Sequence, residues 1–265
     1  MYYEDKRGGM MNVLDIKHIS MKYQDTSGEI NAIDNVSFGV EAGEFVSLVG
    51  PSGCGKSTLL SIVSGLLQPS SGEVFIDGEK AEGISPKIGY MLQKDNLLEW
   101  RSIYRNILLG LEIRGEVNKE SRQYADELLK TYGLYEFKDN YPAQLSGGMR
   151  QRAALIRTLV SKPDILLLDE AFSALDYQTR LAVGDDVYQI IRKENKTVLM
   201  VTHDIPEAIS MSDRIVVLTK RPAEVKAIHP IRFDNLEKRT PLACREEESF
   251  SRYFNLIWKE LDVHV

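Results

Sequence analysis

Short apolar runs separated by turn residues dominate the first eighty residues of the chain. The runs predict strands at residues 13–19, 32–40, 45–49 and 74–76, the last followed by an Asp77-Gly78 hairpin signal. Between the third and fourth runs, apolar residues recur at helical spacing, at Leu59, Leu60, Val63, Leu66 and Leu67. The chain therefore starts as a mixture of strands and one early helix.

The middle of the chain has a different pattern. Residues 96–160 read as almost wholly helical, with the clearest periodicity at 103–113, 121–132 and 148–160. After them strands and helices alternate: strand 165–168, helix 179–193, strand 197–201, helix 207–211 and strand 215–218. Such alternation predicts a mostly parallel sheet wrapped by helices, so the helical stretch is expected to be an insertion into an α/β core.

A last helix is predicted after the charged stretch that follows Pro230. Its apolar residues form one stripe, Phe250, Tyr253, Phe254, Ile257, Trp258 and Leu261. We expect this helix to dock onto the chain's own core, with a partner or regulatory surface as the alternative.

Composition narrows the class of protein. The chain has 265 residues, of which 43% are hydrophobic and 27% charged, as in soluble globular proteins. Its longest strictly apolar runs, such as 165–168 and 215–218, are far shorter than the ~18–20 residues of a spanning helix. Two cysteines suggest a reducing compartment rather than a disulfide framework. The net charge of −6 argues against a nucleic-acid partner.

A glycine-rich loop supplies the first candidate chemistry. The motif GxxxxGK[ST] is complete and lies between an apolar strand and an apolar-striped helix; its residues are Gly50, Pro51, Ser52, Gly53, Cys54, Gly55, Lys56, Ser57 and Thr58. Backbone N–H groups of such a loop converge on phosphate oxygens, and the helix dipole adds positive potential. We expect Lys56 to bridge the β- and γ-phosphates, Ser57 to ligate Mg²⁺ and Thr58 to contact phosphate. Cys54 is expected to be a small residue that fits, or alternatively an oxidation-sensitive thiol.

Two carboxylates end the buried run at 165–168. Asp169 and Glu170 are expected at the carboxyl end of a central strand, where open α/β sheets bind ligands. Asp169 suits Mg²⁺, and Glu170 suits the general base for an attacking water.

The segment Leu145-Ser146-Gly147-Gly148-Met149-Arg150-Gln151-Arg152 resembles the signature sequence of ATP-binding cassette (ABC) ATPases. Other motifs of that family follow in order, and the resemblance spans residues 13–227. It implies that Gln93 is the Q-loop glutamine and a second Mg²⁺ contact, that Asp176 belongs to the D-loop, that His203 is the switch histidine at the γ-phosphate, and that Tyr23 stacks on adenine. Gln93, His203, Lys56 and Glu170 would then form the catalytic set. Asp204 alternatively reads as a helix N-cap with Glu207 at N3.

The resemblance also implies how two chains pair. Ser146 can cap the helix that begins at Gly147, and the glycines leave N–H groups open, which makes a second anion site. In the family, Ser146, Gly147, Gly148 and the D-loop Asp176 would act in trans on ATP held by another copy's phosphate loop.

The expected fold is therefore α/β: a P-loop NTPase core, RecA-like and mostly parallel, with an antiparallel β subdomain and an inserted all-helical subdomain. We assign residues 12–230 to the ABC ATPase domain, with 12–93 and 161–230 as core and 94–160 as helical subdomain, and 231–265 to a C-terminal extension ending in an amphipathic helix.

The family contains several kinds of protein, and this chain resembles the separate ATPase subunit of a bacterial importer. Residues 97–107, Met149 and the turn at 221–223 resemble the nitrate/sulfonate/taurine branch, although Glu99 and Arg105 depart from its pattern. The implied partners are two transmembrane permease subunits, a second copy of the chain and, indirectly, a periplasmic or lipid-anchored solute-binding protein. The implied cofactors are ATP and Mg²⁺, and the implied location is the cytoplasmic face of the cell membrane. Two alternatives stay open: an ATPase of an exporter or lipoprotein-release complex, and a soluble non-transport ABC ATPase.

Overall fold

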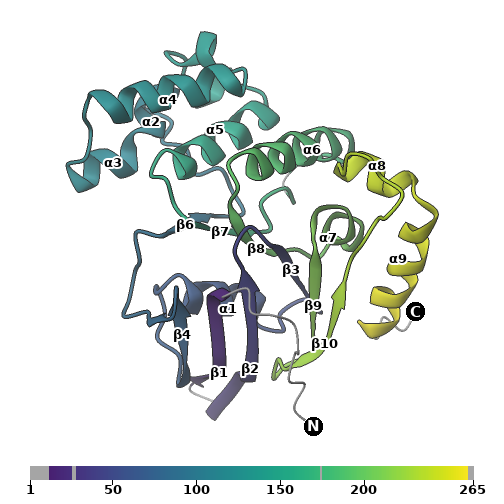
Figure 1. Ribbon diagram of the computed structural model, residues 1–265. Coiled ribbons are helices and arrows are strands. Elements are labelled where there is room, and N and C mark those ends of the chain that lie inside the picture. The colour runs from purple at the N-terminus through teal and green to yellow at the C-terminus, as the bar shows by residue number, and fades with distance from the viewer. Residues whose placement is uncertain (1–11, 26–27, 174, 262–265) are drawn as a thin grey trace.

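A six-stranded sheet forms the centre of the computed structural model, which describes residues 12–25, 28–173 and 175–261 (Figure 1). The strand order is β10-β9-β3-β8-β7-β6. All neighbours are parallel except β10, which runs antiparallel to β9. The strands are β3 (Phe45–Val49), β6 (Ile88–Met91), β7 (Ile165–Asp169), β8 (Thr197–Val201), β9 (Arg214–Leu218) and β10 (Val225–Pro230). This confirms the mostly parallel α/β sheet that the sequence predicts.

The central strands are apolar throughout because both of their faces are covered. In β7, Ile165 and Leu167 belong to one hydrophobic cluster, whereas Leu166 and Leu168 belong to another on the opposite face. All four side chains are fully buried. Since alternate residues of a strand point to opposite faces, a continuous apolar run is what a doubly covered strand requires. The first polar side chain of this strand is Asp169, at its carboxyl end.

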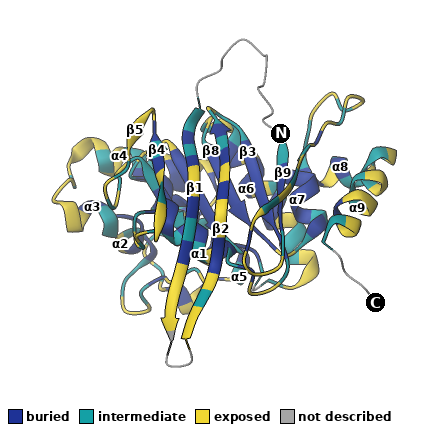
Figure 2. Cartoon of the chain, turned by 90° about the horizontal axis from the view of Figure 1, so that it is seen from below, coloured by how far each residue is buried: buried dark blue, intermediate teal, exposed yellow. Residues whose placement is uncertain are grey.

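A second, antiparallel sheet packs against the cluster that contains Ile165 and Leu167 (Figures 1 and 2). Its order is β2-β1-β4-β5, and its core is shared with α1 (Lys56–Val63). The strands are β1 (Asn12–Asp25), β2 (Gly28–Glu41), β4 (Ser71–Ile76) and β5 (Glu79–Lys80). Asp77 and Gly78, which join β4 to β5, have φ values of 51° and 78°, so the predicted hairpin is confirmed. β1 and β2 are longer than predicted and extend beyond the core as an exposed ribbon (Figure 2).

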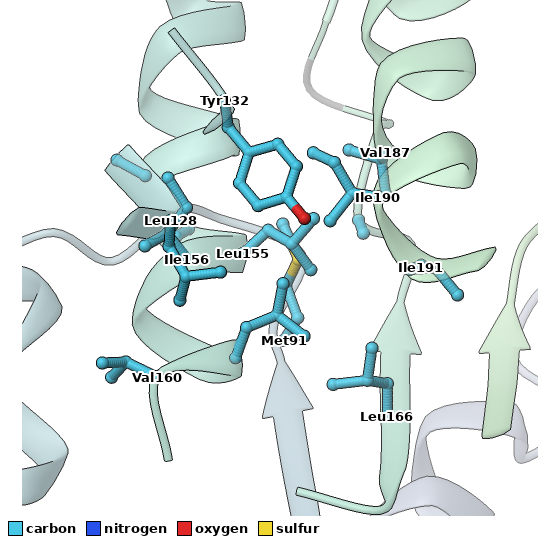
Figure 3. Close-up of a cluster of buried hydrophobic side chains, with 14 of the residues drawn as sticks. Met91, Leu128, Tyr132, Leu155, Ile156, Val160, Leu166, Val187, Ile190 and Ile191 are labelled. Carbon is cyan, nitrogen blue, oxygen red and sulfur yellow. The ribbon is translucent and has the colours of Figure 1, made fainter. Parts of the chain in front are cut away.

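The helical stretch lies between β6 and β7 in the chain and at the top of Figure 1. The predicted helix at 103–113 is divided at Leu108 into two shorter helices. The helices are α2 (Ile103–Ile107), α3 (Leu109–Arg114), α4 (Lys119–Thr131) and α5 (Gly147–Leu159), with 3₁₀ turns at Tyr135–Phe137 and Pro142–Gln144. Figure 3 shows how Leu155 and Ile156 of α5 meet Met91 and Leu166 of the sheet. The stretch is thereby packed onto one face of the central sheet.

Four helices follow β7 in the described part of the chain: α6 (Tyr177–Lys193), α7 (Ile205–Met211), α8 (Pro241–Glu246) and α9 (Glu248–Glu260). The apolar stripe of α9 packs with α7 and β9, and Ile257 is fully buried there. The expectation that the last helix docks onto the chain's own core is thus confirmed, although Trp258 remains 39% exposed. β10 and α8 were not predicted from the pattern. Among the described residues, no helix has both the length and the hydropathy to cross a bilayer.

Candidate functional site

The glycine-rich loop joins β3 to α1 at the carboxyl edge of the central sheet. Gly55, the N-cap of α1, has a φ of 123°, and a Cβ there would lie 3.1 Å from the carbonyl oxygen of Ala32. Only glycine takes that conformation without strain. A cavity of about 490 Å³ opens over the loop and is lined by Ser52, Gly53, Gly55, Lys56, Ser57, Thr58, Glu170, His203 and Arg221. The loop, Glu170 and His203 are therefore neighbours in space.

The ammonium group of Lys56 lies inside this loop. Its Nζ donates hydrogen bonds to the carbonyl oxygens of Gly50, at 2.7 Å, and Pro51, at 2.9 Å. Lys56 is only 6% exposed, and Cys54 beside it is 2% exposed. The thiol is thus enclosed by the loop, as expected of a small residue that fits. A buried ammonium with carbonyl partners is a preformed positive charge facing the loop's interior.

A hydroxyl and a carboxylate meet where β7 ends. Ser57 Oγ donates to Asp169 Oδ1 at 3.0 Å, and the Tyr90 hydroxyl donates to Asp169 Oδ2 at 3.2 Å. Burial raises the pKa of the Asp169 carboxyl above its usual range, and burial also raises the pKa of Tyr90. Within the described residues no cluster of three or more His, Cys, Asp or Glu side chains could hold a metal. The pair instead fits Mg²⁺, which takes hard oxygen ligands, one or two from carboxylates and the rest from water and phosphate.

Glu170 is the meeting point of two further side chains. His203 Nδ1 lies 3.3 Å from Glu170 Oε2, and Gln93 Nε2 donates to the same oxygen at 3.2 Å. Gln93 Nε2 also donates to Ser173 Oγ at 3.1 Å. The amide nitrogen of Gln93 therefore bonds Glu170 and Ser173, and not the Ser57–Asp169 pair. Two side chains, one from just after β6 and one from the β8–α7 loop, therefore converge on the carboxylate that follows β7.

The backbone of Glu170 is unusual. Its φ is 47°, in the left-handed region that L-residues avoid, and its N–H donates to the carbonyl oxygen of Val201 at 2.9 Å. Such a conformation costs on the order of 1 kcal/mol or more and persists only where the surroundings hold it. The hydrogen bond to the end of β8 is one such restraint.

Tyr23 lies next to the loop from the side of the antiparallel sheet. Its hydroxyl is 3.4 Å from Thr58 Oγ1, and the residue is 39% exposed. An exposed aromatic ring beside the phosphate loop offers a face on which a flat base can stack.

The signature residues gather in a different cavity, of about 710 Å³, which Ser146, Gly147, Gly148, Asp176 and Gln93 help to line. Ser146 caps α5 by accepting a hydrogen bond from Met149 N at 3.3 Å. Asp176 caps α6 by accepting one from Thr179 N at 3.1 Å, and hydrogen bonds from the side chain and then the backbone of Thr179 lower the pKa of its carboxyl. A capped helix start with open N–H groups can bind an anion.

Gly148 also sets the distance between the two helices. A Cβ at Gly148 would lie 2.8 Å from Val183 Cγ2, closer than real Cβ atoms come. The glycine therefore allows α5 to pack directly against α6.

Sequence reasoning missed two residues of the site, one in the loop cavity and one beside Asp169. Arg221 donates from its guanidinium to the carbonyl oxygen of Gly53 at 2.7 Å and lines the cavity. Tyr90 donates a hydrogen bond to Asp169, and its polar hydroxyl in β6, just before Gln93, was the available signal. Asp204, read as a possible N-cap, does cap α7 by accepting from Glu207 N at 2.9 Å.

Comparisons with known proteins agree with this geometry. The family described as "ABC transporter" matches residues 33–173. The chain is 45% identical over 252 residues to the "Uncharacterized ABC transporter ATP-binding protein YtlC" of Bacillus subtilis, covering 95% of this chain and 96% of that one. It is 35% identical to the "Taurine import ATP-binding protein TauB" of Roseobacter denitrificans, covering 94% and 95%.

Among solved structures, the chain resembles the dimeric post-hydrolysis state of the ATP-binding cassette MJ0796 bound to ADP and Pi. The TM-score is 0.70 at 35% identity, over 83% of this chain and 99% of that one. The fold is that of a P-loop ABC cassette, and the reaction it supports is ATP hydrolysis. The chain belongs to the ABC transporter family and is one of its ATP-binding, ATP-hydrolysing subunits.

Proposed function

We propose that this chain is the ATPase subunit of an ABC importer of the nitrate/sulfonate/taurine type, bound at the cytoplasmic face of the membrane to two permease subunits. The observation that carries the proposal is similarity along almost the whole chain to taurine import ATP-binding proteins. Those of Roseobacter denitrificans and Ruegeria pomeroyi are 35% and 34% identical, each over 94% of this chain. A separate solute-binding protein would deliver the solute to the permease.

The phosphate chain of ATP binds in the cavity over the glycine-rich loop. Residues 50–58 supply backbone N–H groups, and Thr58 supplies a hydroxyl contact to phosphate. Lys56 exchanges its two carbonyl partners for β- and γ-phosphate oxygens, which is favourable because an ion pair replaces neutral acceptors. Tyr23 stacks on the adenine.

Ser57 and Asp169 would hold Mg²⁺, and the side-chain oxygen of Gln93 would be a further contact, since its Nε2 is the atom that bonds Glu170. The ion would neutralise phosphate charge during the reaction.

Hydrolysis needs a base beside the γ-phosphate. Glu170 accepts a proton from the attacking water, because its carboxylate lines the same cavity as Lys56. His203, 3.3 Å from Glu170, donates a hydrogen bond to the γ-phosphate, and Gln93 orients the carboxylate and the water.

Two copies of the chain complete the site. Ser146, Gly147, Gly148 and Asp176 line a cavity of their own, distinct from the one that Lys56 lines. In a dimer, this anion site would face the γ-phosphate of the ATP that the second copy binds. The solved MJ0796 structure, which this chain resembles, is such a dimer of cassettes. ATP would then join the copies and hydrolysis would release them.

The permease would contact the segment after Gln93. Trp100 is 74% exposed, although the residues around it are firmly held. Asn106 is fully buried, accepts a hydrogen bond from Leu98 N at 2.7 Å and donates to the Leu98 carbonyl oxygen at 3.0 Å. A large aromatic side chain presented on a rigid segment is typical of an interface anchor.

The test is affinity capture of tagged Glu170→Gln from native membranes with ATP in mild detergent. A stoichiometric polytopic protein encoded beside a solute-binding protein is the expected result. Trp100→Ala should reduce its recovery, whereas Ile84→Ala, at a residue 73% exposed in another loop, should not. Recovery of an exporter or lipoprotein-release protein, or of soluble partners only, would contradict the importer assignment and leave the ATPase assignment standing.

A further inference from the structure

A third cavity, of about 770 Å³, lies where four segments of the chain meet. Its walls are the end of α4, the middle of α5, the second half of α6 and the segment before α8. None of the phosphate-loop residues lines it. Its volume falls in the range of roughly 300–1,000 Å³ that is usual for small-molecule sites.

The lining of this cavity is strongly basic. Five cationic side chains contribute to it against one carboxylate, Asp186; the cations are Arg152, Arg192, Lys193, Lys238 and Arg239. The whole chain carries a net charge of −6, so this concentration of positive charge is opposite to the average of the molecule. Basic side chains lining one concave surface focus a positive potential there.

Asp213 and two backbone carbonyl groups, of Gly43 and Ser212, hold two of these arginines, Arg192 and Arg239, in place. Asp213 accepts from Arg192 Nη2 at 2.6 Å and from Arg239 Nη1 at 3.1 Å. The Nε atoms of Arg239 and Arg152 are nevertheless buried and have no hydrogen-bond partner. Protein atoms enclose these Nε atoms, so the contacts open to a ligand come from the rest of the cationic lining, including the exposed Lys193 and Lys238.

From these features we propose that the cavity binds a phosphate-bearing small molecule of about nucleotide size, separate from the ATP at the glycine-rich loop. Guanidinium groups match phosphate oxygens in geometry and charge, and Lys193 and Lys238 at the rim add two exposed charges. The class of ligand is a multiply charged phosphate ester or polyphosphate.

The site is also connected to the signature helix. Arg152 lies on α5 and lines both this cavity and the one that contains Ser146. Its Nη1 is 3.8 Å from Asp186 Oδ2 on α6, a long ion pair that an incoming phosphate replaces. The ligand therefore joins α5 to α6 and to the segment before α8, and it restricts how the helical stretch moves against the sheet.

The experiment measures binding of inorganic tripolyphosphate by calorimetry to the full chain in the Lys56→Ala background, which removes the phosphate-loop lysine. We expect saturable binding of one molecule per chain. Lys193→Ala with Lys238→Ala should weaken it by about tenfold or more, since each lost charge contact contributes on the order of 1 kcal/mol. The matched control, Lys119→Ala with Lys259→Ala, removes two exposed lysines that do not line the cavity.

Three results would overturn the proposal: no saturable binding, equal weakening by the two double variants, or no weakening by either. Equal weakening would indicate general attraction to positive charge, and no weakening would place the anion elsewhere. Hydrogen exchange supplies an independent readout, because bound tripolyphosphate should slow exchange in α5 and around Gly133 in the Lys56→Ala chain and not in the chain that also lacks Lys193 and Lys238.

Discussion

The hydroxyl of Tyr132 donates a hydrogen bond to the carboxylate of Glu194 at 3.0 Å, which joins the end of α4 to the end of α6. Tyr124, on the same helix, donates to the other oxygen at 3.2 Å. Burial, with Glu194 adding to it, raises the pKa of Tyr124 to about 12 and also raises that of Tyr132, so both donate at neutral pH. The helical stretch is thus attached to the core by polar contacts as well as by packing.

Tyr132→Phe should lower the free energy of unfolding by about 1–2 kcal/mol, because a hydrogen bond to a charged group is lost while the ring stays buried. Urea unfolding followed by circular dichroism measures this. Tyr177→Phe, at a residue 64% exposed, is the control and should change stability little. Equal losses in both variants would show that the Glu194 contact contributes nothing specific.

Glu170→Gln should reduce steady-state ATP hydrolysis by at least about 10²-fold, because the amide cannot accept the proton from water. ATP binding should persist, since the phosphate loop is unchanged. Phosphate release and filter binding measure the two quantities, and light scattering should detect an ATP-dependent dimer. Glu237→Gln, at an exposed carboxylate elsewhere, is the control. Retained hydrolysis in Glu170→Gln would remove Glu170 from the role of base.

Lys56→Ala should weaken ATP binding by roughly 10- to 100-fold, because a charge-assisted contact worth about 1.5–3 kcal/mol is lost. Fluorescence titration with a labelled ATP analogue measures the change. Lys119→Ala removes an exposed lysine on α4 and should leave affinity as it is. ATP affinity that is equal in the two variants would argue against the phosphate-loop assignment.

Gly148→Ala should destabilise the protein by about 1–3 kcal/mol through overpacking against Val183, despite the better helix propensity of alanine. In a Val183→Ala background the same substitution should be harmless or stabilising. Gly110→Ala is the control, because a Cβ there meets nothing within 4 Å. The four-variant cycle measured by urea unfolding gives the coupling, and additive effects would mean that the two side chains do not compete for space.

Glu207 makes stability depend on pH. Burial raises the pKa of its carboxyl from 4.5 to about 7, against opposing effects of Thr202, Arg180 and Arg245, whereas Asp204 adds to the rise. The folded state then binds the proton more tightly than the unfolded state, so this contribution to stability is full below pH 4.5 and is lost as pH rises to about 7.

The difference in unfolding free energy between the wild type and Glu207→Gln should therefore fall across that window, by up to about 3 kcal/mol, and level off above it. Urea unfolding at a series of pH values measures it. Glu224→Gln, at an exposed carboxylate, should show no such trend. A flat difference for Glu207→Gln would mean that its carboxyl titrates normally.

The order of strands and helices in the core could be predicted because the runs that form it are short, apolar and bounded by clear turns. β10 could not, since its side chains alternate only between partly buried and exposed on an edge strand. α8 is a six-residue helix with two buried side chains, too short for a period to emerge. The pattern of apolar residues reveals an element only when one of its faces is well buried. Both β10 and α8 bury few side chains, so the pattern does not reveal them.

In the candidate site, too, some positions could be predicted from the sequence and others could not. The loop at 50–58 and the carboxylates at 169 and 170 are adjacent in sequence to the strands that place them, so their positions could be predicted. The contact of Arg221 with the Gly53 carbonyl spans 168 residues and depends on how β9 lies beside β3. The bond from Gln93 to Glu170 depends on side-chain rotation, about which residue order says nothing.

The left-handed backbone conformation of Glu170 affects which substitutions selection for stability would favour. At that position glycine would relieve the strain, so a substitution that removes the proposed base is also one that the main chain favours. Selection for thermal robustness alone would thus drift toward an inactive, better-folded chain. Laboratory evolution for stability in this protein needs a simultaneous screen for turnover, with residue 170 as the first position to sequence among the survivors.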